Sequence, residues 1–291
     1  MATTEKNQVE YRETVAAKSS MTSTARSPDK LNRIFITAEP IEEEVVKAIE
    51  KGDVSPNDDF KHRARILAYE YGWDATDARK IWAFGLGPDS SANLLVDQTK
   101  AIKYLSEIQS DLIAAFQSVT KEGPVSGLPM RGVRFNIVDV VLVDDASGRG
   151  AGQLVETARR AICAAFLLAS PTLLEPVYLA TIQVPESASN TASNLVTKRD
   201  GNIFSEGKAG GDSSYTIGAY VPAMKSIGLE ADLKAAIKGQ VSVQLDHDHW
   251  KSLQGGSLDP ESQAGSLAVE LRQEKGLPAE IPSFETYHDK V

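Results

Sequence analysis

One part of the chain has strand-like and helix-like patterns in a fixed order, and this order restricts the folds that it can adopt. Apolar runs with strand-like spacing predict four strands, and two segments have the spacing of helices. The strands are expected at 177–184, 202–205, 214–221 and 241–245, and the helices at 186–197 and 224–237. Strand, helix, strand, strand, helix, strand is the split-βαβ, ferredoxin-like order. We therefore expect a small ferredoxin-like domain at residues 171–250.

The segments on either side of this domain mix both periodicities. Strands are expected at 9–15, 33–38 and 133–143, and helices at 41–51, 57–71, 75–82, 99–119, 153–168 and 260–275. Loops are expected at 18–27 and 84–93. The sequence therefore predicts an α+β protein with four parts: an N-terminal extension and first strand (1–30), an α+β domain (31–170), the inserted domain (171–250) and a returning C-terminal helix (251–291).

Composition excludes several classes of protein. Hydrophobic residues make up 42% and charged residues 24%, which is ordinary for a globular protein and argues against general disorder. No apolar run approaches the ~20 residues of a membrane span, and the polar N-terminus is not typical of a secretory signal. The net charge of −9 disfavours binding to a phosphate backbone. The lone Cys163 forms no intrachain disulfide. We expect a cytoplasmic protein with no nucleic-acid partner.

An ordered set of motifs runs along almost the whole chain. The motifs are YRETV, RSPDKLNR, DARKIWAFG, FQSVTKEGP, MRGVRF, GAGQ, TARR, EPVYLATIQVPE, GLEADL and DHW. In this wording and order the chain resembles the C-terminal part of translation elongation factor 2, and the fungal version most closely. The resemblance implies domain IV, a ferredoxin-like domain V inserted into it, and a C-terminal helix that returns to domain IV.

The chain departs from that family at positions that translocation uses. The resemblance aligns Gly148 with the histidine that the family converts to diphthamide, and Val143 with a second histidine. No GxxxxGK[ST] phosphate loop occurs in the sequence. Residues 171–250 carry 6 Lys+Arg against 9 Asp+Glu, which is a poor composition for a surface that faces ribosomal RNA. Translocation is therefore not expected of this chain.

Two functions remain open. Fungal elongation factor 2 binds the diterpene glycoside sordarin between its domains III, IV and V, so the resemblance implies a surface shaped for that skeleton. The first hypothesis is a repurposed scaffold, an enzyme that binds a hydrophobic terpenoid and catalyses its intramolecular Diels–Alder cyclisation to a norbornene, as in sordaricin biosynthesis. The alternative is a ribosome- or translation-associated fragment of elongation factor 2 without catalytic or GTPase activity.

The resemblance also implies which residues of this sequence correspond to the residues that line the sordarin site. Tyr11, Tyr178 and His247 are the expected hydrogen-bond donors for catalysis. The expected substrate-binding residues are Glu10, Pro176, Ala223, Lys238, Gly239, Gln240 and Leu245. Residues 1–30 or a second copy of the chain, in a homodimer, are two alternatives for closing the site.

Other patterns favour structural roles. Gly148, Gly150 and Gly152 have GxGxG spacing beside Asp144 and Asp145, which would repel a phosphate. His247 and His249 flank an aspartate, but a changed pocket wall is favoured over a metal site. Cys163, in an alanine-rich helix, is interpreted as a buried inert thiol. We therefore expect no cofactor and no metal.

Overall fold

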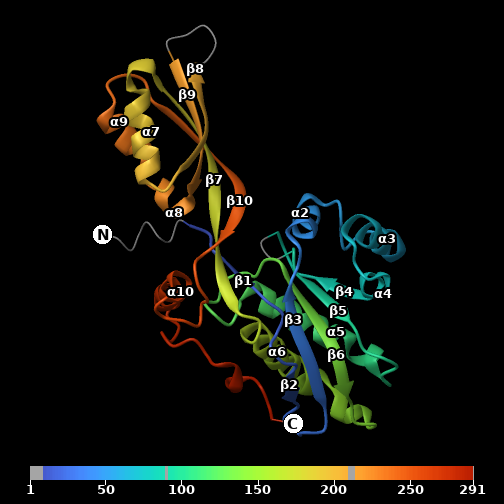
Figure 1. Ribbon diagram of the computed structural model, residues 1–291. Helices are drawn as coiled ribbons and strands as arrows, with labels where there is room; N and C mark the ends of the chain where they lie inside the picture. The colour runs from blue at the N-terminus through green and yellow to red at the C-terminus, as the bar shows by residue number, and fades with distance from the viewer. Residues whose placement is uncertain (1–8, 89–90, 209–213, 291) are drawn as a thin grey trace. The chain divides into compact units, whose positions relative to one another are not determined.

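The computed structural model describes residues 9–88, 91–208 and 214–290 of the chain (Figure 1). The chain forms two compact units. The larger unit contains Arg12–Leu173 and Leu253–Val291, and the smaller unit contains Met1–Tyr11 and Leu174–Ser252. Among the described residues, the smaller unit therefore combines 9–11 with the segment in which the split-βαβ pattern was expected.

A mixed sheet of order β2-β3-β6-β5-β4 forms the centre of the larger unit. Its strands are β2 (Ser23–Arg26), β3 (Arg33–Pro40), β4 (Ile81–Phe84), β5 (Leu94–Asp97) and β6 (Val133–Val141). Only the β5–β6 pair is parallel among these strands. A further short strand, β1 (Arg12–Val15), precedes this sheet in the chain and pairs with β7 in a second sheet.

Two long helices, α5 (Leu105–Lys121) and α6 (Ala151–Leu167), pack against each other and cover one face of this sheet (Figure 1). Phe116 of α5 meets Phe135 of β6 edge to face, with ring centroids 6.0 Å apart, and both side chains are fully buried. This apolar contact fixes the helical layer on the central strand.

The other face of the sheet carries a second apolar cluster, built from β4, β5 and three helices. The helices are α2 (Glu43–Lys51), α3 (Phe60–Tyr71) and α4 (Ala75–Arg79). The C-terminal part of the unit adds α10 (Gln263–Glu274) and the short helix η3 (Phe284–Thr286).

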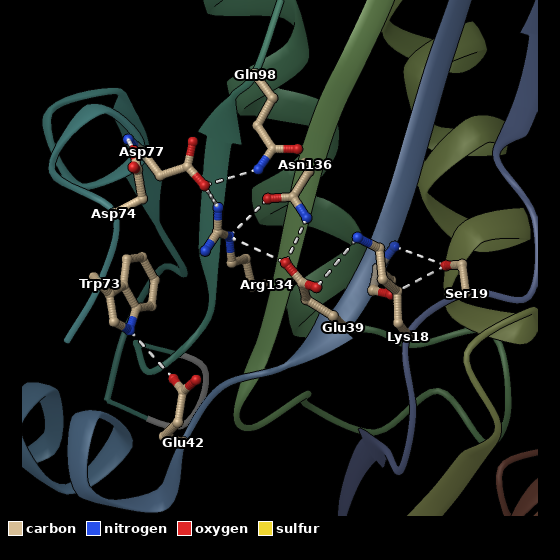
Figure 2. A network of polar contacts seen from close by, with 11 residues as sticks. Lys18, Ser19, Glu39, Glu42, Trp73, Asp74, Asp77, Gln98, Arg134 and Asn136 are labelled. Carbon is tan, nitrogen blue, oxygen red and sulfur yellow. Dashed lines mark hydrogen bonds and ion pairs between the residues drawn. The ribbon is translucent and has the colours of Figure 1, made fainter. Parts of the chain in front are cut away.

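A polar network on this second face is centred on Arg134 of β6 (Figure 2). Its Nε donates to Asn136 Oδ1 at 2.7 Å, and its Nη2 pairs with the Asp77 carboxylate. Asn136 Nδ2 donates in turn to Glu39 Oε1 at 2.8 Å. The guanidinium lies 4.7 Å from the centre of the Trp73 ring. The network therefore ties β3, β6 and α4 together through bonds that satisfy a mostly buried charge.

A buried carboxylate links β1 to the loop before β6. The Glu13 side chain is fully buried and accepts hydrogen bonds from the backbone N–H groups of Val125 (3.1 Å), Ser126 (2.6 Å) and Leu128 (3.2 Å). A Cβ atom on Gly123 would lie 2.0 Å from Glu13 Oε2, so this position requires glycine. Burial raises the pKa of Glu13 to about 7, although the three backbone donors act in the opposite direction.

The second sheet has five strands in the order β1-β7-β9-β8, and β10 also pairs with β7. Most of this sheet belongs to the smaller unit. Besides β1, the strands are β7 (Pro171–Pro185), β8 (Asn202–Lys208), β9 (Ser214–Pro222) and β10 (Ser242–Ser252), and the helices are α7 (Ser189–Lys198), α8 (Ala223–Ser226) and α9 (Leu229–Ala236). A single turn of 3-10 helix, η2 (Glu186–Ala188), precedes α7. Buried side chains of β7 and β9 form a core with α7 and α9. The predicted α+β class and the split-βαβ order are confirmed.

Three expectations about local structure are wrong. Residues 18–27 were expected to be loop, but Ser23–Arg26 forms β2, whose polar side chains conceal its pairing with β3. The helix expected at 75–82 ends at Arg79, and β4 begins at Ile81. The helix expected at 224–237 is divided into α8 and α9, because Gly228 has φ 74° at the N-cap of α9.

We predict that Glu13 makes the stability of the larger unit depend on pH. Its pKa is higher in the folded chain (about 7) than the ordinary value of 4.5, so its contribution is complete below pH 4.5 and is lost as the pH rises through 7. The loss is on the order of 3 kcal/mol. Urea unfolding between pH 5 and 8 should show a slope that Glu13→Gln flattens. Glu44→Gln, at an exposed position, is the matched control, and equal slopes in both variants would contradict the prediction.

Candidate functional site

Two of the predicted donors lie directly opposite each other on neighbouring strands of the smaller unit. In the antiparallel pairing of β7 with β10, Tyr178 is the register partner of His247. Residues opposite each other in such a pair place their side chains on the same face, with Cβ atoms about 5 Å apart. Tyr178 is partly exposed and His247 is exposed. The sheet therefore presents a phenol and an imidazole side by side.

A β-bulge determines which side chains of β10 share this face. The register passes from His247 opposite Tyr178 to His249 opposite Val177, so Asp248 is the extra residue. His249 consequently lies on the opposite face from His247, where its ring contacts Tyr220 with centroids 5.6 Å apart. The two histidines therefore cannot bind one metal ion together.

The bulge also brings Trp250 to the face of His247. Trp250 is the register partner of Pro176, and its ring lies 5.3 Å from the His247 ring between centroids. Leu245, two residues before His247, is opposite Ala180 and is 39% exposed. The face thus combines two polar groups with an indole ring and an exposed leucine. We call Tyr178, Leu245, His247 and Trp250 the β7–β10 face.

Pro176 and Ala223 are close to this face but offer little surface to a ligand. Pro176 is buried, and Ala223, the first residue of α8, is 1% exposed. The adjacent Met224 N–H donates to Glu175 Oε1 at 3.0 Å, which fixes the start of α8 to β7. Burial raises the pKa of this Glu175 carboxyl. Pro176, opposite Trp250, is on the side of this face but is covered by other residues, and Ala223 has almost no accessible surface.

Lys238, Gly239 and Gln240 are exposed in the loop between α9 and β10, far from Tyr178 along β7. Gly239 has φ 132°, and a Cβ atom there would lie 2.8 Å from Pro185 Cγ. Pro185 is the last residue of β7, and Tyr178 is roughly 23 Å away along the strand, at about 3.3 Å per residue. The structure therefore does not bring these three residues together with Tyr178 and His247.

Glu10 and Tyr11 belong to the same compact unit as the β7–β10 face. Glu10 is exposed, whereas Tyr11 is only 3% exposed. A tyrosine that is this well buried presents little of its ring to a ligand without a local movement of the chain.

Sequence reasoning did not place Trp250 in the site. It belongs to the DHW motif, and it is the only tryptophan of the smaller unit, which is the signal that would have singled it out. The bulge had no detectable signal, because a regular strand would place Trp250 on the face opposite His247.

Metal and thiol chemistry find no structural support in the described part of the chain. No group of three or more His, Cys, Asp or Glu side chains is placed to hold a metal ion among these residues. Cys163 is buried, and desolvation raises the pKa of its thiol to about 12, so it is a poor nucleophile.

The loop that contains Gly148 is held in place by contacts with neighbouring residues of the larger unit. Gly148 lies in the 3-10 helix η1 (Ala146–Arg149), where a Cβ atom would be 2.8 Å from Val143 Cγ1. The Arg149 guanidinium is 3.9 Å from the centre of the Tyr104 ring and donates to Glu107 Oε2 at 2.7 Å. This arginine is therefore committed to internal contacts rather than displayed to a polyanion.

Comparison with protein families identifies both parts of the chain. Residues 52–170 match the family described as elongation factor G, domain IV, and residues 172–260 match the family described as elongation factor G C-terminus. The chain therefore carries domains IV and V of the elongation factor G and elongation factor 2 family. The resemblance to these two domains is confirmed. In the part of the chain that the structure describes, no helix is long and apolar enough to cross a membrane.

We predict that the bulge can be detected by disulfide formation. Opposite Cα atoms of an antiparallel pair are about 4.5–5.5 Å apart, within the range that a disulfide spans. Tyr178→Cys with His247→Cys should oxidise readily, as measured by thiol counting and mass spectrometry. Tyr178→Cys with His249→Cys should stay reduced, because those side chains lie on opposite faces. Equal oxidation of both pairs would contradict the register.

Proposed function

We propose that this chain is a cofactor-independent enzyme of the cytoplasm. It binds a hydrophobic terpenoid and catalyses its intramolecular Diels–Alder cyclisation, the norbornene-forming step of sordaricin-type biosynthesis. The observation that carries the proposal is the pairing of Tyr178 and His247 beside Leu245 and the Trp250 ring, on a domain of the family whose fungal member binds sordarin.

The proposed reaction needs only what such a face offers. In an intramolecular [4+2] cycloaddition, three π bonds become one π bond and two new C–C bonds. No atom, proton or electron enters or leaves. A protein accelerates this step mainly by holding a flexible diene and dienophile in a reactive geometry. Apolar surface for the carbon skeleton and a few fixed hydrogen-bond donors are therefore sufficient.

Each residue of the face then has a separate task. Leu245 and Trp250 provide apolar and aromatic surface for the terpenoid skeleton. Tyr178 Oη–H and the His247 imidazole donate to a carbonyl oxygen on the dienophile. Electron density on that oxygen grows as the new bonds form, so these hydrogen bonds strengthen in the transition state and lower the barrier.

The remaining candidates act at a distance or provide a cover. Lys238 and Gln240, near the other end of β7, could reach only a distant polar group of a long substrate, and Gly239 permits the close approach of Pro185. Glu10 and Tyr11 belong to the N-terminal segment 1–30, which is one of two alternatives for covering the face. A second copy of the chain is the other.

The alternative is a non-catalytic protein that binds ribosomes. The relationship of the chain to elongation factors favours this alternative. Three observations oppose it. Gly148 cannot become diphthamide, and a histidine there would collide with Val143. Arg149 is held by Glu107, and Arg160 is held by Asp289 at 3.0 Å. Cations that are already paired release few counterions when they meet RNA.

Kinetics with purified protein test the proposal. We expect an activated cyclopentadiene–enal precursor to cyclise faster with the chain than in buffer alone, where the background rate is measured in parallel. His247→Ala and Tyr178→Phe should each reduce the acceleration by about tenfold for every 1.4 kcal/mol of transition-state stabilisation lost. His249→Ala is the matched control, because His249 faces the other side of the sheet. No acceleration by the wild-type chain would refute the proposal.

A test of shape is better made at Leu245 than at Ala223. Ala223 is 1% exposed, so Ala223→Trp would overpack the core and destabilise the unit. Leu245→Trp adds bulk at a site that is already 39% exposed. We expect the cyclisation rate to fall with little change in melting temperature. A normal rate in Leu245→Trp, together with normal rates in both donor variants, would place the reaction elsewhere.

Ribosome binding separates the alternative from the enzyme. Co-sedimentation at ~0.15 M salt, where surface charges are screened over about 8 Å, should leave the chain in the supernatant. Stoichiometric pelleting with ribosomes would favour the translation-associated protein.

A further inference from the structure

A cavity in the larger unit has features of a ligand site that the β7–β10 face does not explain. It has a volume of about 630 Å³ and lies between the start of α3, strand β4 and helix α5. Its lining includes Phe60, Arg63, Trp82, Phe84, Leu86 and Ile113. Cavities of 300–1,000 Å³ with mainly apolar walls and a few polar groups are typical of small-molecule sites.

The cavity contains a buried cation whose hydrogen-bonding capacity is poorly used. Arg63 is 6% exposed, and among the described residues its Nη1 and Nη2 donate only to the carbonyl oxygens of Ser55 and Ile81, at 3.4 and 3.5 Å. Its Nε is buried and has no hydrogen-bond partner among the described residues. Burial of a guanidinium is costly unless its donors are satisfied. Because the Nε group is covered by protein atoms, the donors that Arg63 offers to a ligand in the cavity are its two Nη groups, whose present hydrogen bonds are long.

Two carboxylates near Arg63 determine whether a neutral or a negatively charged acceptor of the ligand is favoured. Asp58 and Asp59 also line the cavity, and their charges raise the pKa of Arg63 while its desolvation, the larger effect, lowers it. Both are held by backbone donors: Asp58 accepts from Ser55 N–H at 2.7 Å, and Asp59 caps α3. They balance the charge of Arg63 through space and would repel a second anion. A neutral carbonyl oxygen meets the guanidinium donors without that repulsion.

The walls indicate an apolar body for the ligand. Phe60 is 48% exposed and Leu86 62% exposed, although both side chains are hydrophobic. Phe84 lies under the guanidinium, with its ring centre 5.1 Å from Arg63 Cζ. Exposed aromatic and aliphatic side chains around a cavity gain free energy when a ligand covers them.

We propose that this cavity binds a hydrophobic small molecule through a neutral carbonyl oxygen, which accepts from Arg63 while the apolar body lies against Phe60, Trp82 and Leu86. The site goes beyond the proposed cyclase function and lies in the other compact unit. It does not depend on Tyr178 or His247.

Fluorescence anisotropy with three pyrene probes tests the site in the full-length chain. Methyl 1-pyrenebutyrate carries a neutral carbonyl, 1-pyrenebutyrate carries a carboxylate, and 1-butylpyrene lacks an acceptor. We expect the methyl ester to bind at least tenfold more tightly than butylpyrene and more tightly than the carboxylate. Binding of the ester no tighter than that of butylpyrene overturns the proposal. Tightest binding of the carboxylate overturns the assignment of a neutral acceptor.

Matched variants locate the probe. Arg63→Gln should weaken ester binding at least tenfold, whereas Arg65→Gln, at an exposed position of the same helix, should not. If Arg63→Gln unfolds, as judged by circular dichroism, the exposed Phe60 serves instead. Phe60→Ala should weaken binding severalfold, and Tyr69→Ala, at an 85% exposed position, should not. Equal binding by the variants and their controls overturns the site, and His247→Ala should have no effect on ester binding.

Discussion

The extra residue Asp248 in β10 is the constraint on which the candidate site depends. Side chains of a regular strand alternate between faces, so a one-residue insertion exchanges the faces of everything beyond it. Here it leaves His247 opposite Tyr178, returns Trp250 to their side and moves His249 to the other face. The ring contacts of His247 with Trp250 and of His249 with Tyr220 agree with this register. A polar pair thus acquires an aromatic neighbour, and a metal-binding pair is excluded by the same bulge.

Much of the fold follows from periodicity, and the exceptions have identifiable causes. The apolar runs of β6 and β7 and the amphipathic spacing of α5 predicted those elements, because tertiary packing rewards the same pattern that is visible in the sequence. Strand β2 was missed since it consists of Ser, Thr, Ala and Arg, and only its hydrogen bonds with β3 make it a strand. Short β4 was missed because it follows α4 almost directly.

The site was predicted from ancestry and only partly assembled by the structure. Tyr178, Leu245 and His247 gather on one face because they lie on adjacent strands, which the split-βαβ order implies. Lys238, Gly239 and Gln240 lie near the other end of β7, since the loop after α9 ends beside Pro185. Alignment with a family shows which residues correspond to one another, but it does not show how far apart two of them lie along a strand. Arg63 had no sequence signal at all, because its burial depends on segments that precede and follow it in the chain.

The tryptophan indole signals of the ¹⁵N-labelled chain give the most direct test of the central claim, which is that a terpenoid binds at the β7–β10 face. The Trp250 signal reports on that face, and the Trp82 signal reports on the Arg63 cavity. Trp73 packs against Arg134 and belongs to neither site, so its signal serves as an internal reference. We expect titration with sordaricin, the norbornene product, to shift the Trp250 signal saturably and to leave the Trp73 signal unchanged. A titration that moves only Trp82, or no indole signal, would contradict it.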